Sequence, residues 1–472
     1  MTDFPTTPAD QEPEAMVVSQ LANAVQTGLP VAIADLGRLV RIPSVSWDGF
    51  DSSQVEKSAE VVCELLASLE FFESVAVSRA PIDSERLGQP AVLATRAARN
   101  GRPTILLYAH HDVQPPGDPE QWESGPFEPT VRGDRLYGRG AADDKAGVLV
   151  HIAAIRALRR VVGGDIDLGV VVFIEGEEEF GSRSFGAFLA QHRSELAADV
   201  IVIADSDNWN VSTPSLTVGL RGNVTFKLRV STLDHAVHSG MFGGAAPDAM
   251  LATIALLATL HDADGAVAVA GLHSREATLP DYEEARLFEA AALLEGVVPI
   301  GRGHILSRLW NQPAITITGI DAPTVVNASN ALAPSVTVKV SARVAPEQSA
   351  ADAFTAIESH LREHAPFGAH LEFIDIDRGD PFLVDTTGWA VTAAKDAMAA
   401  GWGVEPIETG IGGSIPFISQ LAGDFPRAQI LITGVEDPDS RAHSPNESLH
   451  LGVFRRAILT EAILLEKLNR RA

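Results

Sequence analysis

The segment LGVVVFIEGEEEFGS, residues 168–182, joins an apolar run to a cluster of carboxylates. Residues 168–174 are apolar, continuous and rich in β-branched side chains, which predicts a strand that is buried on both faces. Chemistry in open α/β sheets takes place at the carboxyl ends of such strands. Glu177, Glu178 and Glu179 would repel one another there, and bound cations would offset the cost of burying them. The alternative is a solvated acidic turn.

The composition is that of an ordinary globular protein with an acidic surface. The chain has 472 residues, 46% of them hydrophobic, and a formal net charge of −26. This charge argues against nucleic-acid and anionic-membrane partners, and an anionic substrate would need locally placed arginines or helix N-termini. A single cysteine, Cys63, excludes an internal disulfide. Residues 1–14 resemble a disordered tail and not a signal peptide, and no long apolar run predicts a membrane span, so we expect a cytoplasmic enzyme.

Two further motifs stand at the ends of predicted elements, one after a strand and one before a helix. The apolar run 104–108 leads into His110 and Asp112, which point to the same side if the chain stays extended. One of them could bind a metal ion while the other supports it by a hydrogen bond, although solvated loop histidines are the simpler alternative. Asp143 and Asp144 directly precede a predicted helix, where a pair of capping residues is the alternative to a binding role.

The remaining buried strands also end in polar residues. The run 198–204 is followed by Asp205 and Asp207, and the run 429–433 leads to a loop that contains His443. Because the carboxyl ends of parallel strands meet at one edge of a sheet, we expect these groups to lie together.

The hydrophobic pattern of the sequence changes in the middle of the chain. Strands such as 224–230 alternate between apolar and polar residues, which predicts a sheet that is covered on one face only. We therefore place a small α+β domain at 214–379, inserted between the two segments of an α/β domain, 15–213 and 380–472.

Together the strand ends supply more ligands than a single ion needs. The set contains two histidines and several carboxylates but no thiolate, which suits zinc and also cobalt or manganese. Two ions about 3.5–4 Å apart that share one carboxylate would use them all, and a spare carboxylate could serve as a general base. The candidates are His110, Asp143, the Glu178–Glu179 pair, His443, and either Asp205 or Asp207.

The motifs together resemble the di-zinc aminoacylase/carboxypeptidase/carnosinase family of metallopeptidases, and among these the cytosolic dipeptidase branch. The similarity spans nearly the whole chain after residue 36. The matching segments are YAHHDVQP (108–115), LYGRGAADDK (136–145), EGEEEFGS (175–182), DSDN (205–208), GLRG (219–222), HSG (238–240), SAR (341–343), GGSIP (412–416) and AHSPNE (442–447).

The resemblance implies a two-segment α/β catalytic domain with an inserted ferredoxin-like domain that serves as lid and dimerisation module. It also implies two metal ions, with zinc the best fit. One ion would be held by His110, Asp143 and Asp207. The other would be held by Asp143, Glu179 and His443, so that Asp143 bridges the pair.

Further roles follow from the resemblance alone. Asp112 would orient His110. Glu178 would be the general base, whereas the residues by themselves leave the choice among the three glutamates open. His238 of the inserted domain would reach the active site of the partner subunit and stabilise the oxyanion, which implies a homodimer.

A substrate carboxylate would have its own binding residues. Arg343 resembles the arginine that holds the substrate's C-terminal carboxylate in a bidentate manner. Gly413 and Ser414, at a predicted helix start, would present backbone N–H groups to an anion.

We therefore expect a metal-dependent dipeptidase acting on small peptides with a free C-terminal carboxylate. The first alternative is a deacylase of N-acyl amino acids, of the acetylornithine or succinyl-diaminopimelate type. The second is a non-catalytic metal-binding protein with the same fold.

Overall fold

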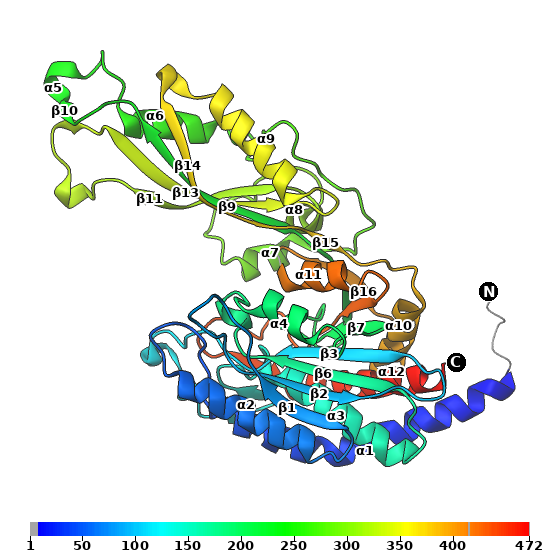
Figure 1. Ribbon diagram of the computed structural model, residues 1–472. Helices are drawn as coiled ribbons and strands as arrows, with labels where there is room; N and C mark the ends of the chain where they lie inside the picture. Colours follow the sequence, from blue (N-terminus) through cyan, green and yellow to red (C-terminus); the bar gives the residue numbers. More distant parts are fainter. Residues whose placement is uncertain (1–7, 414–415, 472) are drawn as a thin grey trace. The chain divides into compact units, whose positions relative to one another are not determined.

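The computed structural model describes residues 8–413 and 416–471, and the chain forms two compact units (Figure 1). We call them the large unit and the small unit. The large unit consists of Met1–Val218, Val384–Thr409 and Gln420–Ala472, and the small unit of Gly219–Leu383 and Gly410–Ser419.

The units differ from the expected domains in two places. The small unit begins and ends a few residues later than 214–379, and it also includes Gly410–Ser419, which we had assigned to the large domain. Arg221 explains the second difference, because its backbone N–H donates to Ile411 O at 3.2 Å and its Nε donates to Gly412 O at 3.2 Å. Part of the expected tail is also helical, since the first helix begins at Pro8.

A largely parallel sheet forms the centre of the large unit. Its strands follow the order β1-β2-β6-β3-β7-β17-β8, in which β6, β3, β7 and β17 run parallel. Every residue of β6 is buried, as its continuous apolar sequence predicts. The strands are β1 (Ser74–Ser78), β2 (Ala91–Arg96), β3 (Thr104–His110), β6 (Gly169–Glu175), β7 (Val200–Ile203), β8 (Ser215–Leu220) and β17 (Gln429–Ile432).

Helices cover both faces of this sheet. In Figure 1, α1, α2 and α3 lie on one side of it and α4 lies on the other. Helix α3 begins directly after Asp144 and packs against both α1 and α12. The helices are α1 (Pro8–Val40), α2 (Ser52–Ala67), α3 (Lys145–Val162), α4 (Phe185–His192), α10 (Trp389–Trp402) and α12 (Leu451–Arg470).

Helix α1 has an unusual composition. Its segment Ala15–Val40 is, among the described helices, the one long and apolar enough to cross a membrane by length and composition. Leu21, Leu36 and Leu39 of this segment are fully buried. Part of its apolar surface therefore belongs to the core of the large unit.

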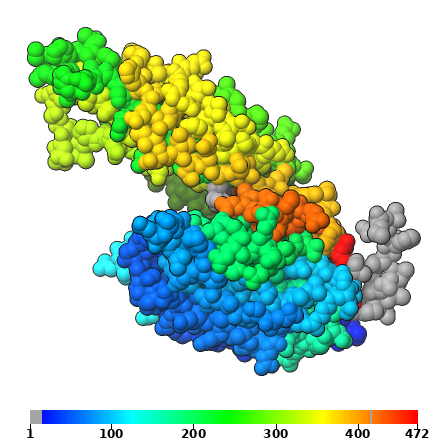
Figure 2. Space-filling model, in the orientation of Figure 1, coloured from blue at the N-terminus to red at the C-terminus, as the bar shows by residue number. Residues whose placement is uncertain are grey.

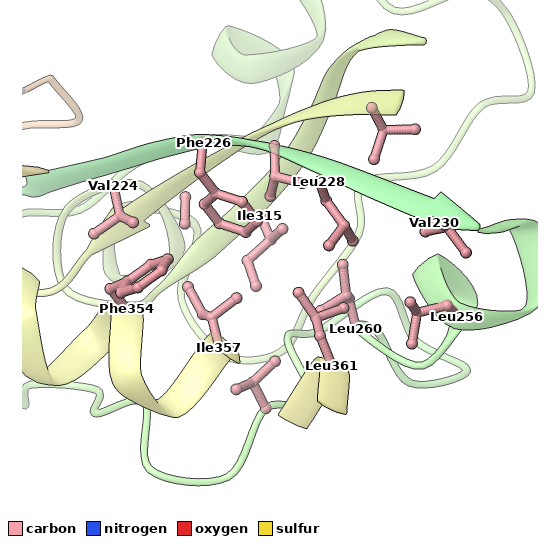
Figure 3. Packing of buried hydrophobic residues seen from close by; sticks show 14 of the residues in the cluster. Val224, Phe226, Leu228, Val230, Leu256, Leu260, Ile315, Phe354, Ile357 and Leu361 are labelled. Atoms are coloured by element: carbon pink, nitrogen blue, oxygen red, sulfur yellow. The ribbon is translucent and has the colours of Figure 1, made fainter. Parts of the chain in front are cut away.

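The small unit has a ferredoxin-like topology. The chain order is β9-α6-β11-β13-α9-β14, and the antiparallel sheet has the order β11-β13-β9-β14. One face of the sheet packs against α6 and α9, where Phe226, Leu228, Leu256, Phe354 and Ile357 form much of the core (Figure 3). The bounds are β9 (Gly222–Ser231), α6 (Ala249–Ala258), β11 (Ala314–Asp321), β13 (Ser335–Val344), α9 (Ala350–Glu363) and β14 (His370–Gly379).

Shorter elements complete the two units. A small sheet of the large unit joins β18, β5 and β4, and a two-stranded ladder of the small unit joins β10 and β12. The remaining bounds are β4 (Thr130–Arg132), β5 (Arg135–Tyr137), β10 (Val237–His238), α5 (Ser239–Phe242), α7 (Glu284–Ala290), α8 (Ile305–Trp310), β12 (Ala331–Leu332), β15 (Phe382–Leu383), β16 (Ile407–Ile411), α11 (Pro416–Asp424) and β18 (Ser448–His450).

Candidate metal centre

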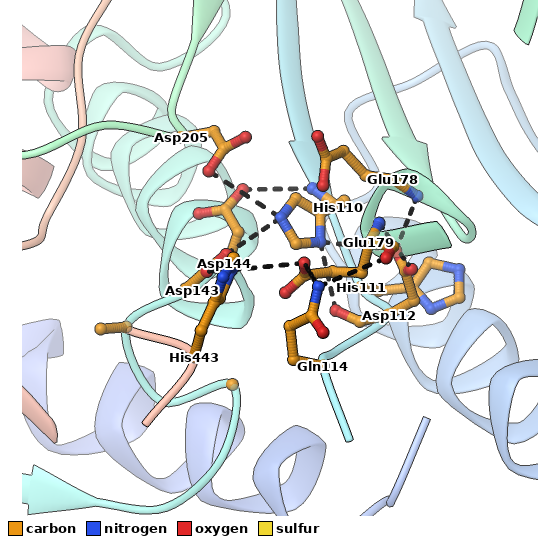
Figure 4. A network of polar contacts seen from close by, with 12 residues as sticks. His110, His111, Asp112, Gln114, Asp143, Asp144, Glu178, Glu179, Asp205 and His443 are labelled. Atoms are coloured by element: carbon orange, nitrogen blue, oxygen red, sulfur yellow. Dashed lines mark hydrogen bonds and ion pairs between the residues drawn. The ribbon is translucent and has the colours of Figure 1, made fainter. Parts of the chain in front are cut away.

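The carboxyl ends of the parallel strands are level with one another. In the register of the sheet, Tyr108 of β3 lies opposite Phe173 of β6 and Ile203 of β7. The polar segments that follow these strands therefore leave the sheet at the same edge. Figure 4 shows that the side chains predicted from the strand ends gather there.

Asp143 lies between two histidines. Its Oδ1 is 3.1 Å from His110 Nε2, and its Oδ2 is 2.8 Å from His443 Nε2. The same nitrogen of His443 lies 3.3 Å from Glu179 Oε2. Asp143 thus belongs to two overlapping groups whose ligand atoms lie within 4.8 Å of one another, namely His110, Asp143 and Asp205, and Asp143, Glu179 and His443.

The first group contains Asp205, whereas the resemblance implies Asp207 at this position. Asp205 Oδ1 is 3.8 Å from His110 Nε2. Asp207 lies outside both groups, and its backbone forms a parallel bridge with Glu436. The side chain of Asn208 donates to Gly434 O at 3.0 Å, which holds this part of the chain against the segment after β17.

Asp112 links one histidine to the glutamate segment. His110 Nδ1 lies 3.1 Å from the Asp112 carbonyl oxygen and 3.4 Å from its Oδ1. The carboxylate of Asp112 also accepts from the backbone N–H groups of Glu178 and Glu179, both at 3.1 Å, and from Ser46 Oγ at 2.6 Å. Asp112 therefore fixes the orientation of His110 and the path of the chain after β6.

A buried ion pair organises the loop that carries Asp143. Glu447 Oε2 lies 2.6 Å from Arg139 Nη1, and both side chains are almost completely buried. Glu447 also accepts from the backbone N–H groups of Ala142 at 3.0 Å and Asp143 at 3.1 Å. Since Glu447 follows His443 closely in sequence, one segment supplies a histidine of the cluster and supports its shared aspartate.

The titratable groups of the centre depend strongly on one another. Burial, reinforced by Asp143, raises the pKa of Glu179 to about 7, and burial with Asp205 and Glu179 nearby raises the pKa of Glu178 well above its ordinary value. Hydrogen bonds to Asp143 and Glu179 raise the pKa of His443 to about 11.

This donor set fits divalent cations. Without them, protons must offset the repulsion among buried carboxylates, whereas a cation at each group would replace those protons. Two imidazoles and three carboxylates are ligands that zinc, cobalt and manganese accept.

The other predicted site residues belong to the small unit or lie outside the described residues. His238 is exposed, and its Nδ1 accepts from the backbone N–H of Gly240 at 3.0 Å. Figure 2 shows the atoms around α5, which follows His238, on the surface at one end of this unit. Arg343 of β13 is half-buried. A Cβ atom added at Gly413 would make only an ordinary contact, with the side chain of Ile411. Ser414 lies outside the described residues.

Comparison with known proteins explains the arrangement. A model of peptidase family M20/M25/M40 matches residues 106–467, which contain every residue of the two overlapping groups. The chain belongs to this peptidase family. This confirms the metallopeptidase family that the sequence motifs resemble.

Two relatives of the chain are named as a dipeptidase and a metallodipeptidase. The chain is 35% identical over 368 residues to a cysteinylglycine-S-conjugate dipeptidase of Corynebacterium striatum, covering 77% of this chain and 80% of the relative. It is 26% identical to the Cys-Gly metallodipeptidase DUG1 of Saccharomyces cerevisiae, covering 93% and 95% of the two chains. The expected enzyme class, a metallodipeptidase, is confirmed.

Solved structures confirm the fold class. Dug1p from Saccharomyces cerevisiae superposes with a TM-score of 0.77 at 23% identity, covering 96% of this chain and 99% of that one. Human carnosine dipeptidase 1 gives a TM-score of 0.77 at 24% identity, with the same coverage.

Several supporting residues of this family member were missed from the sequence. Gln114 Nε2 donates to Glu179 Oε2 at 2.7 Å, and the backbone N–H of His110 donates to Asp144 Oδ2 at 3.1 Å. Ser46 and Glu447 also escaped notice as supporting groups. Glu447 stands in the quoted AHSPNE motif, which was the one available signal, whereas nothing in the spacing of Ser46 indicates a contact with Asp112.

Proposed function

We propose that this metallodipeptidase hydrolyses dipeptides with a free C-terminal carboxylate and uses two divalent ions to do so. The observation that carries the proposal is the position of Asp143, whose two carboxylate oxygens face different histidines. One ion would be held by His110, Asp143 and Asp205, and the other by Asp143, Glu179 and His443.

Zinc fits these ligands best, and cobalt or manganese would also be accepted. When bound, the ions supply Lewis acidity, which polarises the scissile carbonyl and lowers the pKa of an attacking water. Asp112 contributes by holding His110 in one orientation.

Glu178 is the proposed general base. It lies beside the cluster but is not needed as a ligand in either group. Asp112 fixes its backbone through the Glu178 N–H, and burial, reinforced by Asp205 and Glu179, holds the pKa of Glu178 well above its ordinary value, which makes it a stronger proton acceptor than an exposed carboxylate. It would take the proton of the attacking water and later deliver it to the leaving amine.

Substrate recognition is assigned to the small unit. Arg343 would hold the C-terminal carboxylate, with Gly413 and Ser414 presenting backbone N–H groups. Arg343 has no acidic partner among the described residues that would compete for it. The partner's His238 would stabilise the oxyanion in a homodimer, a proposal supported by the exposure of His238.

The surface of the small unit also supports a homodimer. Large apolar side chains are exposed there, and they include Met241, Phe242, Leu251 and Ile254. The expected partners are thus a small peptide and a second copy of the chain. The expected location is the cytoplasm, which suits a chain with a single cysteine.

A substrate panel tests the function. Metal-stripped protein would be assayed after addition of zinc, cobalt or manganese, with Cys-Gly, β-Ala-His, other dipeptides and N-acetyl or N-succinyl amino acids. We expect metal-dependent release of amino acids from dipeptides, and its loss in a Glu178→Gln variant. Turnover of acylated amino acids alone would show the deacylase instead. Metal binding with no turnover of either class would show a binding protein.

A further inference from the structure

Both glutamates of the candidate metal centre stand on one short turn. Glu178 and Glu179 belong to a 3-10 helix, Glu178–Phe180, that follows β6. Their backbone N–H groups both donate to the carboxylate of Asp112 at 3.1 Å, which holds the turn on one side. A turn keeps a single orientation more firmly when its carbonyl groups have donors as well. The donor to the Glu179 carbonyl is therefore of interest.

Trp47 supplies this donor from a distant part of the sequence. Its Nε1–H donates to Glu179 O at 2.9 Å. Gln114 Nε2 also approaches this oxygen, at 3.3 Å, but the same nitrogen donates to Glu179 Oε2 at 2.7 Å. Because Gln114 is directed mainly at the carboxylate (Figure 4), the indole of Trp47 is the principal donor to the carbonyl.

A second contact holds the indole ring against the same turn. Trp47 stacks on Phe180 with ring centroids 5.1 Å apart and an interplanar angle of 23°. The guanidinium of Arg183 lies 4.0 Å from the centroid of the Phe180 ring. Aromatic stacking and a cation–π contact both favour one orientation of this ring. Trp47 thus contacts the turn at two points, a carbonyl oxygen and an aromatic side chain.

The segment that carries Trp47 is itself anchored beside the centre. Ser46 Oγ donates to Asp112 Oδ2 at 2.6 Å, and Val45 forms a parallel bridge with Val113. Trp47 is 38% exposed, so it adds less to the hydrophobic core than a buried tryptophan would. Its contacts with the turn, and not burial, explain its position best.

We propose that Trp47 is a positioning residue for Glu178 and Glu179. This inference rests on the proposed function, in which Glu179 holds one ion and Glu178 takes the proton of the attacking water. Asp112 holds the N–H groups of the turn, and Trp47 holds its carbonyl side. Loss of the indole N–H would free the turn to shift, and a displacement of about 1 Å in a reacting group can cost about a hundredfold in rate.

The test separates the indole N–H from the aromatic ring. Trp47→Phe keeps a ring that can stack on Phe180 but removes the donor. Trp122→Phe is the matched control, because Trp122 Nε1 also donates to a backbone carbonyl, that of Pro116, at 2.8 Å. Metal-stripped samples are titrated with zinc in competition with a chelator. Denaturant unfolding is measured on the same samples, and kcat and KM are measured on metal-loaded protein with a dipeptide.

We expect Trp47→Phe to lower the affinity for one of the two proposed ions by about tenfold and to leave the other affinity unchanged, because supporting residues of metal sites contribute about tenfold to a hundredfold. The kcat should fall by about tenfold or more while KM stays the same, since the proposed substrate-binding residues are intact. Trp122→Phe should match the normal protein in both measurements.

Unchanged affinity for both ions in Trp47→Phe would overturn the inference, and so would an equal loss in Trp122→Phe. Equal weakening of both ions together with a lower free energy of unfolding would also overturn it, because a purely structural role explains that pattern. If the normal metal-loaded protein cleaves no dipeptide, the proposed function fails, while the zinc titrations still decide the role of Trp47.

Discussion

The carboxylate of Glu447 accepts a hydrogen bond from the backbone N–H of Asp143 at 3.1 Å. This contact joins two loops that are far apart in sequence, and both of them supply residues to the candidate metal centre. Because Glu447 also pairs with the buried Arg139, its position is fixed before any ion binds. The centre is therefore partly preorganised by residues that are not ligands.

Removal of this carboxylate should destabilise the protein and weaken metal binding together. We expect Glu447→Ala to lower the free energy of unfolding by about 3–5 kcal/mol, because the buried guanidinium of Arg139 loses its partner. Denaturant unfolding and metal stoichiometry measure the two effects. Asp439→Ala is the control, since its side chain is 84% exposed in the same loop. Unchanged stability in Glu447→Ala would contradict the supporting role.

The two aspartates after β7 should behave differently. Asp205→Asn should lower the affinity for one of the two proposed ions by about tenfold or more, because even supporting residues of metal sites contribute that much. Asp207→Asn should change this affinity little, since Asp207 lies outside both groups. Competition with a chelator measures the metal affinity of both variants. Equal losses in the two variants would rule out this ligand assignment.

This pair also shows where sequence reasoning reached its limit. Short apolar runs predicted the buried strands, and the polar residues after them predicted which loops meet. Asp205 and Asp207 are two residues apart and would point to the same side of an extended chain, so the periodicity of the sequence could not separate them. The approach of Asp205 Oδ1 to His110 Nε2, at 3.8 Å, separates the two residues, and it depends on tertiary packing that no local pattern records.

The small unit gives a second example. Alternating apolar residues in β9 predicted a sheet with one covered face, and the burial of β9 alternates in that way. Nothing in the sequence around Gly412 indicated that this segment belongs to the small unit. Its assignment follows from hydrogen bonds to Arg221, which is distant in sequence.

Replacement of the proposed base should abolish turnover without removing the ions. We expect Glu178→Gln to lower kcat by about 10²–10⁴, the usual contribution of a positioned general base, while metal stoichiometry stays the same. Steady-state kinetics and metal analysis on the same preparation test this. Near-normal kcat in the metal-loaded variant would exclude Glu178 as the base.

His111 should make the metal-free protein sensitive to acid. Burial lowers its pKa to about 4, whereas a histidine in an unfolded chain titrates near 6.5. The unfolded state therefore takes up this proton first as the pH falls from 6.5 toward 4, and the free energy of unfolding should decline by about 3 kcal/mol over that range. Unfolding of metal-stripped protein at several pH values measures the slope. In His111→Gln this part of the slope should disappear, and an identical slope would exclude His111 as its source.

The proposed homodimer should depend on the exposed face of α6. Leu251 and Ile254 are each 57% exposed and lie one turn apart, so two glutamates there would place charges in a buried interface. We expect sedimentation of the normal protein at twice the chain mass of 50.0 kDa, and of the Leu251→Glu/Ile254→Glu variant at 50.0 kDa. Leu87→Glu, at a residue 63% exposed in the large unit, is the control and should stay dimeric.

The same dimer predicts complementation between two inactive variants. In a mixed dimer of His238→Ala and Glu178→Gln chains, one active site combines an intact Glu178 with the partner's His238. Mixing the two after dissociation and reassociation should therefore restore activity that neither variant has alone. The Leu251→Glu/Ile254→Glu variant is the control. Because it is expected to stay monomeric, it should not complement either inactive chain. A mixture that stays inactive while mixed dimers are shown to form would contradict the assignment of His238 to the partner's active site.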